Sequence, residues 1–359
     1  MRVRACPLVA LLLAACSDLK TYAAGDAGVD GVEPVTSDGG TAGADRGASG
    51  IVVEVLAANR DRPGARSPAG FRPWRTGIAV SGDRVYWVES GTMPGLYVAP
   101  TLPCPGTDCV EKVADAVRPA SFTATSTHVY YADTAVIKRL SFGGGTPETV
   151  ASASDEVVNL AATDSALFWS AGDHQELQRT LFGGTTSTFI RSNGTPVSFA
   201  IAGERLYWAG VDISGQTVAL QTIGVDGKGA REVARFSGGF HTMAGNETYL
   251  YFAENNPGNI HRLTASTGRE EVVAREALGV TDIAVDDRYA YWVEPGNGDF
   301  RNGRVRRIGH DAREAETLAE SIPRPVAIAV SDDAVFVASS GTEEKEWKDG
   351  AILRLSVLK

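Results

Sequence analysis

The sequence predicts an all-β protein in which one structural unit is repeated around a ring. The main observation is a pair of adjacent aromatic residues that returns at intervals of 38 to 45 residues. Its copies are Tyr86-Trp87, Tyr130-Tyr131, Phe168-Trp169, Tyr207-Trp208, Tyr251-Phe252, Tyr291-Trp292 and, in its weakest form, Phe336-Val337. A period of this length is typical of repeat architectures. A complete copy has four short strand-like runs and no stretch shows a helical period of about 3.6 residues, so we expect a seven-bladed β-propeller of four-stranded antiparallel blades.

The four runs of a unit differ in their patterns. The first is a short apolar run, such as residues 78–80, and a polar turn separates it from the aromatic pair. The second run contains the pair and has β-branched and aromatic residues at both odd and even positions, which is typical of a strand buried on both faces. The third run alternates between apolar and polar residues, as in 305–308. The fourth begins with Glu and ends with Ala, as in 271–274.

The last unit reaches the end of the chain with only three of its four runs. Its fourth run is found near the other end, where Val53-Glu54-Val55-Leu56-Ala57 fits the pattern of the fourth strands. We therefore expect residues 51–58 to pair with residues 351–358 and to close the ring, which would cover two exposed strand edges. Six blades and a decayed seventh copy are the alternative, because Phe336-Val337 is the weakest pair.

Three copies of the unit resemble a known repeat. These are Tyr86-Trp87-Val88-Glu89, Tyr130-Tyr131-Ala132-Asp133 and Tyr291-Trp292-Val293-Glu294, which are similar to the YWTD-type repeat of low-density-lipoprotein receptor class B propellers. The resemblance covers residues 72–359 and implies a shared fold, but no shared ligand. No copy is a full YWTD, Ala171 and Gly210 replace the acidic residue in two blades, and that family has six copies.

The N-terminus has the features of an export signal. Arg2 and Arg4 precede a mostly apolar run that ends at residue 15 and is too short to span a bilayer as a stable helix. Leu13-Ala14-Ala15-Cys16 resembles the lipobox of bacterial lipoproteins, which implies cleavage before Cys16, acylation of Cys16 and, because Ser17 follows, an outer-membrane location. We expect a signal peptide at 1–15 and a protein that is lipid-anchored in the bacterial cell envelope. A plain secretory signal is the alternative.

Residues 16–50 are expected to form the lipidated cysteine and a disordered linker, and residues 51–359 the propeller. The linker is rich in Gly, Ala, Asp, Ser and Thr, and it cannot bury enough apolar surface to offset its ordering entropy. In an exported protein that has lost Cys6 and carries a lipid on Cys16, the two remaining cysteines, Cys104 and Cys109, predict a local disulfide across a Pro-Gly turn.

Charge and motifs exclude several function classes. The formal charge is −10 and there is no basic run, which argues against a nucleic-acid partner. The five histidines are scattered without metal-ligand spacing and are expected at surface or turn positions. The sequence has neither a G-x-S-x-G elbow nor a P-loop. We expect a monomer without a cofactor.

Two long loops predict a ligand-binding face. The segments between the second and third strands are long in the sixth and seventh units (295–304 and 340–350), and neighbouring blades would bring them together. An exposed aromatic residue beside charges in such loops is typical of a contact surface, so we expect a membrane-tethered extracytoplasmic binding or scaffold protein with a protein or glycan ligand. The wall would contain Asp299, Phe300, Arg301, Glu343, Glu344, Glu346, Trp347 and Lys348. Loops that vary in length without a function are the alternative.

Acidic residues at the same face suggest a second function. Glu254 and Glu294 end their second strands, and Asp282 and His241 start innermost strands, so the four could hold a divalent cation with mostly oxygen ligands. This alternative is a metal-dependent enzyme, similar to propeller lactonases or lyases. More often, acids at these positions bond to backbone amides of the neighbouring blade.

Overall fold

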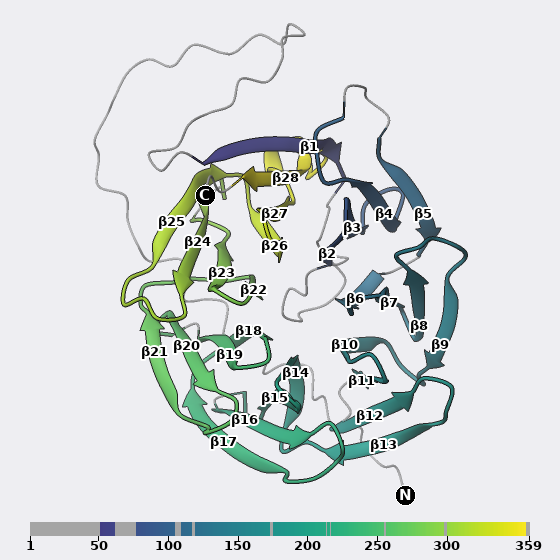
Figure 1. Cartoon of the computed structure of the whole chain (residues 1–359), viewed down its shortest axis with the longest axis vertical. Coiled ribbons are helices and arrows are strands. Elements are labelled where there is room, and N and C mark those ends of the chain that lie inside the picture. The colour runs from purple at the N-terminus through teal and green to yellow at the C-terminus, as the bar shows by residue number, and fades with distance from the viewer. Residues whose placement is uncertain are drawn as a thin grey trace, which may run out of the picture. The chain divides into compact units, whose positions relative to one another are not determined.

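Seven four-stranded antiparallel sheets are arranged around a ring in the computed structural model (Figure 1). This confirms the seven-bladed β-propeller, and the alternative of six blades is wrong. All of the described residues belong to one compact unit, residues 44–359. The signal peptide, the lipid on Cys16 and the linker lie outside them. The structure describes residues 51–61, 77–104, 109–116, 119–172, 175–212, 214–215, 217–254, 256–297 and 300–356.

The blades follow one another along the chain, and each runs from an innermost to an outermost strand. Blade 1 contains β2 (Ile78–Ser81), β3 (Arg84–Glu89), β4 (Gly95–Pro100) and β5 (Glu111–Asp115), and blade 2 contains β6 (Pro119–Ala124), β7 (His128–Asp133), β8 (Val136–Ser141) and β9 (Glu148–Ser152). Blade 3 contains β10 (Val157–Ala162), β11 (Ala166–Ala171), β12 (Glu176–Leu181) and β13 (Thr186–Arg191), and blade 4 contains β14 (Thr195–Ala202), β15 (Arg205–Val211), β16 (Thr217–Gly224) and β17 (Arg231–Ser237). Blade 5 contains β18 (Phe240–Gly245), β19 (Tyr249–Glu254), β20 (Asn259–Thr264) and β21 (Glu270–Ala274), and blade 6 contains β22 (Asp282–Val285), β23 (Tyr289–Glu294), β24 (Gly303–Gly309) and β25 (Glu316–Ile322). Blade 7 contains β26 (Pro325–Val330), β27 (Ala334–Ser339), β28 (Gly350–Ser356) and β1 (Val52–Arg60).

The N-terminal strand completes the last blade. Strand β1 pairs antiparallel with β28, from Val52 opposite Ser356 to Arg60 opposite Gly350. Figure 1 shows β1 lying along the outer edge of the blade that also contains the C-terminal strand. The predicted closure is therefore confirmed, and both ends of the propeller are held in one sheet.

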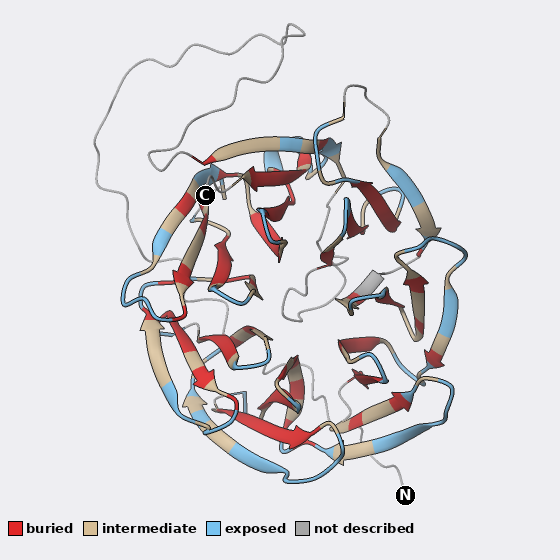
Figure 2. Ribbon diagram, viewed as in Figure 1, coloured by how far each residue is buried: buried red, intermediate tan, exposed pale blue. Residues whose placement is uncertain are grey.

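The aromatic pairs form the core between the blades. Their side chains are almost fully buried, as in Trp87, Tyr131 and Trp292, whose exposed fractions are all 0%. Within the described part of the chain, buried apolar residues form seven clusters, one between each two neighbouring blades. Figure 2 shows this burial on the inner strands, while the outermost strands are largely exposed or intermediate. Burial of each large aromatic side chain contributes about 1.5–3 kcal/mol, so the pairs stabilise the contacts between neighbouring blades.

The indole N–H groups of the core explain the acidic residue that follows some pairs. Trp87 donates to Glu89 at 2.8 Å and Trp292 donates to Glu294 at 2.9 Å. Blades 3 and 4 lack the acid, and there hydroxyl groups take its place. The indole of Trp169 donates to Thr180 at 3.0 Å and that of Trp208 to Ser192 at 2.9 Å. The departures at Ala171 and Gly210 are therefore compensated by hydroxyl groups on β12 and in the β13–β14 connection, because a buried indole needs an acceptor.

The cysteine pair braces one outer turn. Cys104 and Cys109 form a disulfide with a Cα–Cα distance of 6.3 Å, between β4 and β5 of blade 1. This confirms the predicted disulfide and its place between the third and fourth strands. No helix in the described residues is both long and apolar enough to cross a membrane.

Candidate functional site

Three side chains from separate segments meet at the face where blades 6 and 7 adjoin. Arg324 lies in the two-residue connection from β25 to β26, between the blades. Its Cζ atom is 5.0 Å from the ring centroid of Phe300 in the β23–β24 loop and 4.5 Å from that of Trp347 in the β27–β28 loop. A guanidinium group at this distance from an aromatic ring is attracted by the ring's quadrupole, which contributes about 0.5–2 kcal/mol per contact. We call Phe300, Arg324 and Trp347 the aromatic–arginine stack.

Backbone hydrogen bonds hold the three segments together. The amide of Arg324 donates to the carbonyl of Phe300 at 2.7 Å, and the carbonyl of Arg324 accepts from the amide of Ser340 at 3.1 Å. The amide of Trp347 donates to the carbonyl of Thr342 at 2.9 Å. The stack is therefore positioned by the main chain as well as by contacts of its own side chains.

Each of the two long loops is held by hydrogen bonds to a side chain of its own last residue, and we call this arrangement the brace of the loop. In blade 7, Asp349 accepts from the amide and the hydroxyl of Thr342, both at 2.7 Å. In blade 6, Asn302 accepts from the amide of Asn297 at 2.8 Å. Each acceptor precedes the glycine that begins the third strand, and each amide donor follows another glycine with positive φ. At Gly341, with a φ of 83°, a Cβ atom would lie 2.3 Å from Oδ1 of Asp349. Such an Asx brace fixes a loop that has little other structure.

The backbone of this face is strained. Phe300, Arg324, Glu346 and Trp347 have φ angles of 59°, 40°, 53° and 63°. Positive φ is uncommon for residues with large side chains and costs about 1–3 kcal/mol each. Strain of this kind persists only where the surroundings determine the conformation, and it gathers at functional sites.

Charged residues surround the stack. Arg301 forms an ion pair with Glu344, and Lys348 donates to Glu346 at 2.8 Å, a bond that holds the pKa of Glu346 below its usual range. These pairs are mostly exposed and contribute little to stability. They give the face a polar rim of both signs around an aromatic centre.

Six of the predicted wall residues lie in the stack or its charged rim, namely Phe300, Arg301, Glu344, Glu346, Trp347 and Lys348. Glu343 is exposed and begins the short helix η2 (Glu343–Lys345). Asp299 lies outside the described residues. Sequence reasoning missed Arg324, because this arginine is not in a long loop and no pattern distinguishes it from other surface arginines.

The residues of the alternative metal site have other partners. Asp282 accepts from the backbone amide of Ile328 in the next blade at 2.9 Å. Glu294 is 3% exposed and accepts from Arg304 at 2.6 Å in addition to the Trp292 indole. Glu254 accepts from Nε2 of His261 at 3.1 Å. The three carboxylates thus accept hydrogen bonds that connect neighbouring strands or, at Asp282, neighbouring blades.

The fourth residue, His241, is largely buried. Its Nδ1 atom lies 3.0 Å from the carbonyl of Val280 and must donate to it, since a carbonyl only accepts. Burial lowers the pKa of His241, so its ring is neutral at pH 7. Across the described residues, no group of three or more His, Cys, Asp or Glu side chains could hold a metal ion.

The expectation that the histidines lie at surface or turn positions was wrong for His241, which is on β18, and for His261. His261 lies on β20 with 5% exposure, stacked on Phe252 at a centroid distance of 4.7 Å. Its two ring nitrogens contact Glu254 at 3.1 Å and Glu270 at 2.5 Å. Because it occupies a polar position of an alternating strand, its pattern does not differ from that of an exposed residue.

Comparison with solved structures supports the fold. Neither a family model nor a curated protein sequence matches the chain. The chain is similar to virginiamycin B lyase from Staphylococcus aureus, with a TM-score of 0.60 and 14% identity over 86% of this chain and 100% of that chain. It is also similar to a chain of the mitotic checkpoint complex, with a TM-score of 0.60 and 13% identity over 91% of this chain and 100% of that chain.

A chain of the nidogen/laminin complex matches with a TM-score of 0.47 and 18% identity, over 60% of this chain and 86% of that chain. A score this low carries no argument. At identities of this order the other likenesses show a shared propeller fold and nothing about ligands.

Proposed function

We propose that this protein is an extracytoplasmic binding module that contacts a partner protein through the face where blades 6 and 7 adjoin. The observation that carries this proposal is the aromatic–arginine stack, in which Arg324 contacts both Phe300 and Trp347. Tryptophan and arginine are the side chains most enriched among residues that dominate binding energy, and they act best at the centre of a contact with a polar rim.

The strained backbone supports the same proposal. Phe300, Arg324 and Trp347 are held at positive φ by backbone hydrogen bonds within and between their segments. Side chains that are ordered before the partner arrives lose less conformational entropy on binding, so a preorganised face binds more tightly than a mobile one. The energetic cost of the strained backbone is consistent with this role.

The rim charges favour a protein over a glycan as the partner. Arg301 and Lys348 lie beside Glu344 and Glu346 in exposed ion pairs. Both signs of charge on one rim suit a partner surface that also carries both signs, and charge complementarity of this kind gives specificity and steers association.

We place the protein at the bacterial cell envelope on the strength of the lipobox-like Leu13-Ala14-Ala15-Cys16. The metal-dependent enzyme predicted as an alternative has no supporting ligand group among the described residues, and no specific observation favours it.

The test is crosslinking and capture from native membranes, followed by titration of the captured partner in purified form. Arg324→Lys keeps the charge but loses the planar group, and Trp347→Ala removes one ring. Arg288→Ala is the matched control, because Arg288 also contacts a ring, that of Tyr289 at 5.9 Å, in blade 6.

We expect the first two variants to weaken binding at least tenfold and the control to bind like wild type. Equal binding by all three would refute the proposal, and a captured oligosaccharide would replace the protein partner with a glycan.

A further inference from the structure

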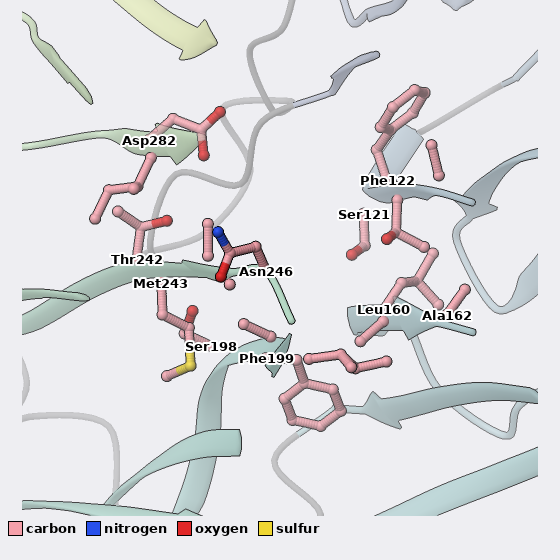
Figure 3. Close-up of a pocket in the computed structure, with 18 of the residues that line it drawn as sticks. Ser121, Phe122, Leu160, Ala162, Ser198, Phe199, Thr242, Met243, Asn246 and Asp282 are labelled. Carbon is pink, nitrogen blue, oxygen red and sulfur yellow. The ribbon is translucent and has the colours of Figure 1, made fainter. Parts of the chain in front are cut away.

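The centre of the ring contains a second candidate site, separate from the aromatic–arginine stack. A cavity of about 450 Å³ lies among the innermost strands, and all seven of these strands contribute to its lining (Figure 3). This volume falls in the range of about 300–1,000 Å³ that small-molecule sites occupy.

One layer of the lining is entirely apolar. On each innermost strand, one residue lies directly opposite the second residue of the aromatic pair on the next strand. These seven residues form the layer, and all of them line the cavity. They are Ile78, Phe122, Leu160, Phe199, Met243, Ile283 and Ile328. The layer would surround a bound molecule with an apolar ring contributed by every blade.

Of the residues one position earlier, four are polar and also line the cavity. Ser121, Ser198, Thr242 and Asp282 occupy this layer, and Figure 3 shows the side chains of Ser121, Thr242 and Asp282 pointing from different strands toward the open centre. The two serines and the threonine are buried, with exposed fractions of 5%, 4% and 9%. The hydrogen bonds of the described residues include none to these three hydroxyl groups. A hydroxyl can donate and accept, so each of these groups could form a hydrogen bond with a molecule bound in the cavity.

The charge of the lining selects against anions. Asp282 and Glu247 are carboxylates in the lining, and none of the described residues that line the cavity is Lys or Arg. His241 also lines it, and the Nδ1 atom of this residue donates to the carbonyl of Val280 rather than pointing a free donor at the ligand. A ligand with a carboxylate or phosphate would meet like charge in a poorly solvated place.

We propose that this channel binds a small uncharged organic molecule with an apolar body and a hydroxyl-type head. The body would contact the ring that contains Phe199 and Met243, and the head would hydrogen-bond to Ser121, Ser198 or Thr242. The site involves none of the residues of the aromatic–arginine stack, so each of the two proposals can fail without the other.

The methionines provide a direct measurement. The chain contains three, Met1, Met93 and Met243. Met243 lines the cavity, whereas Met93 is 65% exposed in the loop after β3. In the full-length protein with ¹³C-labelled methionine methyl groups, NMR would follow titration with 4-phenylbutan-1-ol and with 4-phenylbutanoate, which share one carbon skeleton and differ in the charge of the head.

We expect the alcohol to shift the Met243 methyl signal to saturation while Met93 stays in place, and the carboxylate to shift neither. Thr242→Val and Ser198→Ala should each weaken alcohol binding about three- to tenfold, because each removes one hydrogen-bonding hydroxyl. Thr188→Val, on the exposed face of β13, is the control and should bind as wild type.

Several outcomes would overturn the proposal: no shift of Met243 with the alcohol, equal shifts with both probes, equal shifts of Met243 and Met93, or unchanged affinity in both hydroxyl variants. If Thr242→Val does not fold, the smaller change Ser198→Ala decides the role of the polar layer.

Discussion

Arg354 on β28 donates from Nη1 to Oε2 of Glu54 on β1 at 2.7 Å, and the two residues are 300 positions apart in the chain. They are direct partners in the register of the two strands. The same pair of residue types joins the third and fourth strands inside other blades, where Arg139 meets Glu148 at 2.9 Å and Arg262 meets Glu271 at 2.8 Å. The N-terminal strand thus gives blade 7 the glutamate that other blades obtain from their own fourth strand.

The Arg354–Glu54 pair lies at the seam of the ring, where β1 meets β28. We expect Arg354 to contribute more to the free energy of unfolding than the corresponding arginine within another blade. The Arg354 side chain is 10% exposed and also reaches Asp333 at 3.3 Å, whereas the side chains of Arg139 and Glu148 are 31% and 65% exposed. We expect Arg354→Met to lower the free energy of unfolding by about 1–3 kcal/mol, and Arg139→Met by less than about 1 kcal/mol. Urea unfolding measures both, and equal losses would show that the seam is no different from a blade interior.

The closure of the ring was predictable because strand registers repeat. Cross-strand neighbours interact directly, and blades 2, 5 and 6 each keep a glutamate on the fourth strand opposite an arginine on the third, whereas blade 3 places Ser187 opposite Arg179. The run that contains Glu54 fits that pattern although it lies at the other end of the sequence. The number of blades was predictable from the seven copies of the aromatic pair, because each pair belongs to the core between two blades.

The candidate site was predictable only in part. Loop length identified the segments with Phe300 and Trp347, but Arg324 reaches them from the connection between the blades, and only the fold brings that connection to the loops. The acids were harder to interpret. The sequence around Glu294 does not show whether this residue binds a cation or accepts a hydrogen bond from the Trp292 indole. Other donors that decide its role come from the neighbouring strand.

The buried carboxylate of Glu294 leads to a second prediction. It accepts from Trp292 at 2.9 Å, from Arg304 at 2.6 Å and from Arg306 at 3.4 Å. Glu294→Ala would leave a buried indole and a largely buried guanidinium without this acceptor, and we expect the free energy of unfolding to fall by about 2–4 kcal/mol. Thermal and urea unfolding test this, with the exposed Glu320→Ala as control. A loss no larger than that of the control would mean that the carboxylate does not stabilise the fold, and would return it to the list of candidate ligands.

The pH dependence of stability should have opposite signs at two carboxyl groups. Burial raises the pKa of Glu89 above its ordinary value of 4.5, against the opposing effect of hydrogen bonds from Arg60 and Trp87. Between 4.5 and the raised pKa, the folded chain binds this proton more strongly than the unfolded chain, so the contribution of Glu89 to stability falls as pH rises. The hydrogen bond from Arg262 lowers the pKa of Glu271, whose contribution is present above 4.5 and is lost as pH falls through the lowered pKa.

Urea unfolding between about pH 3.5 and 6.5 would resolve these signs. The difference in unfolding free energy between wild type and Glu89→Gln should decrease with rising pH, and the difference for Glu271→Gln should increase. The second slope should be shallow, since the side chain of Glu271 is 40% exposed and screened by solvent. Two slopes of the same sign would contradict the assignment of burial as the dominant effect on Glu89.

The brace of the blade 7 loop should control the order of the aromatic–arginine stack without touching it. Asp349 holds the amide and hydroxyl of Thr342, and the carbonyl of Thr342 in turn accepts from the amide of Trp347. Removing the carboxylate in Asp349→Ala frees the loop around Gly341, so the amides of residues 342 and 347 should exchange with solvent at least tenfold faster. Hydrogen–deuterium exchange measures this directly.

Asp212 provides the matched control for this experiment, because it braces the corresponding loop of blade 4 by accepting from the hydroxyl of Thr217 at 2.6 Å. Asp212→Ala should leave exchange in residues 341–350 unchanged, and neither variant should alter exchange in β27 and β28, whose amides are protected by strand pairing. Where a partner has been captured, Asp349→Ala should weaken its binding because the Trp347 ring is no longer held in place before contact. Unchanged exchange at residue 347 would show that the ring is fixed by its contact with Arg324 alone, and the preorganisation of the face would then rest on the stack rather than on the loop.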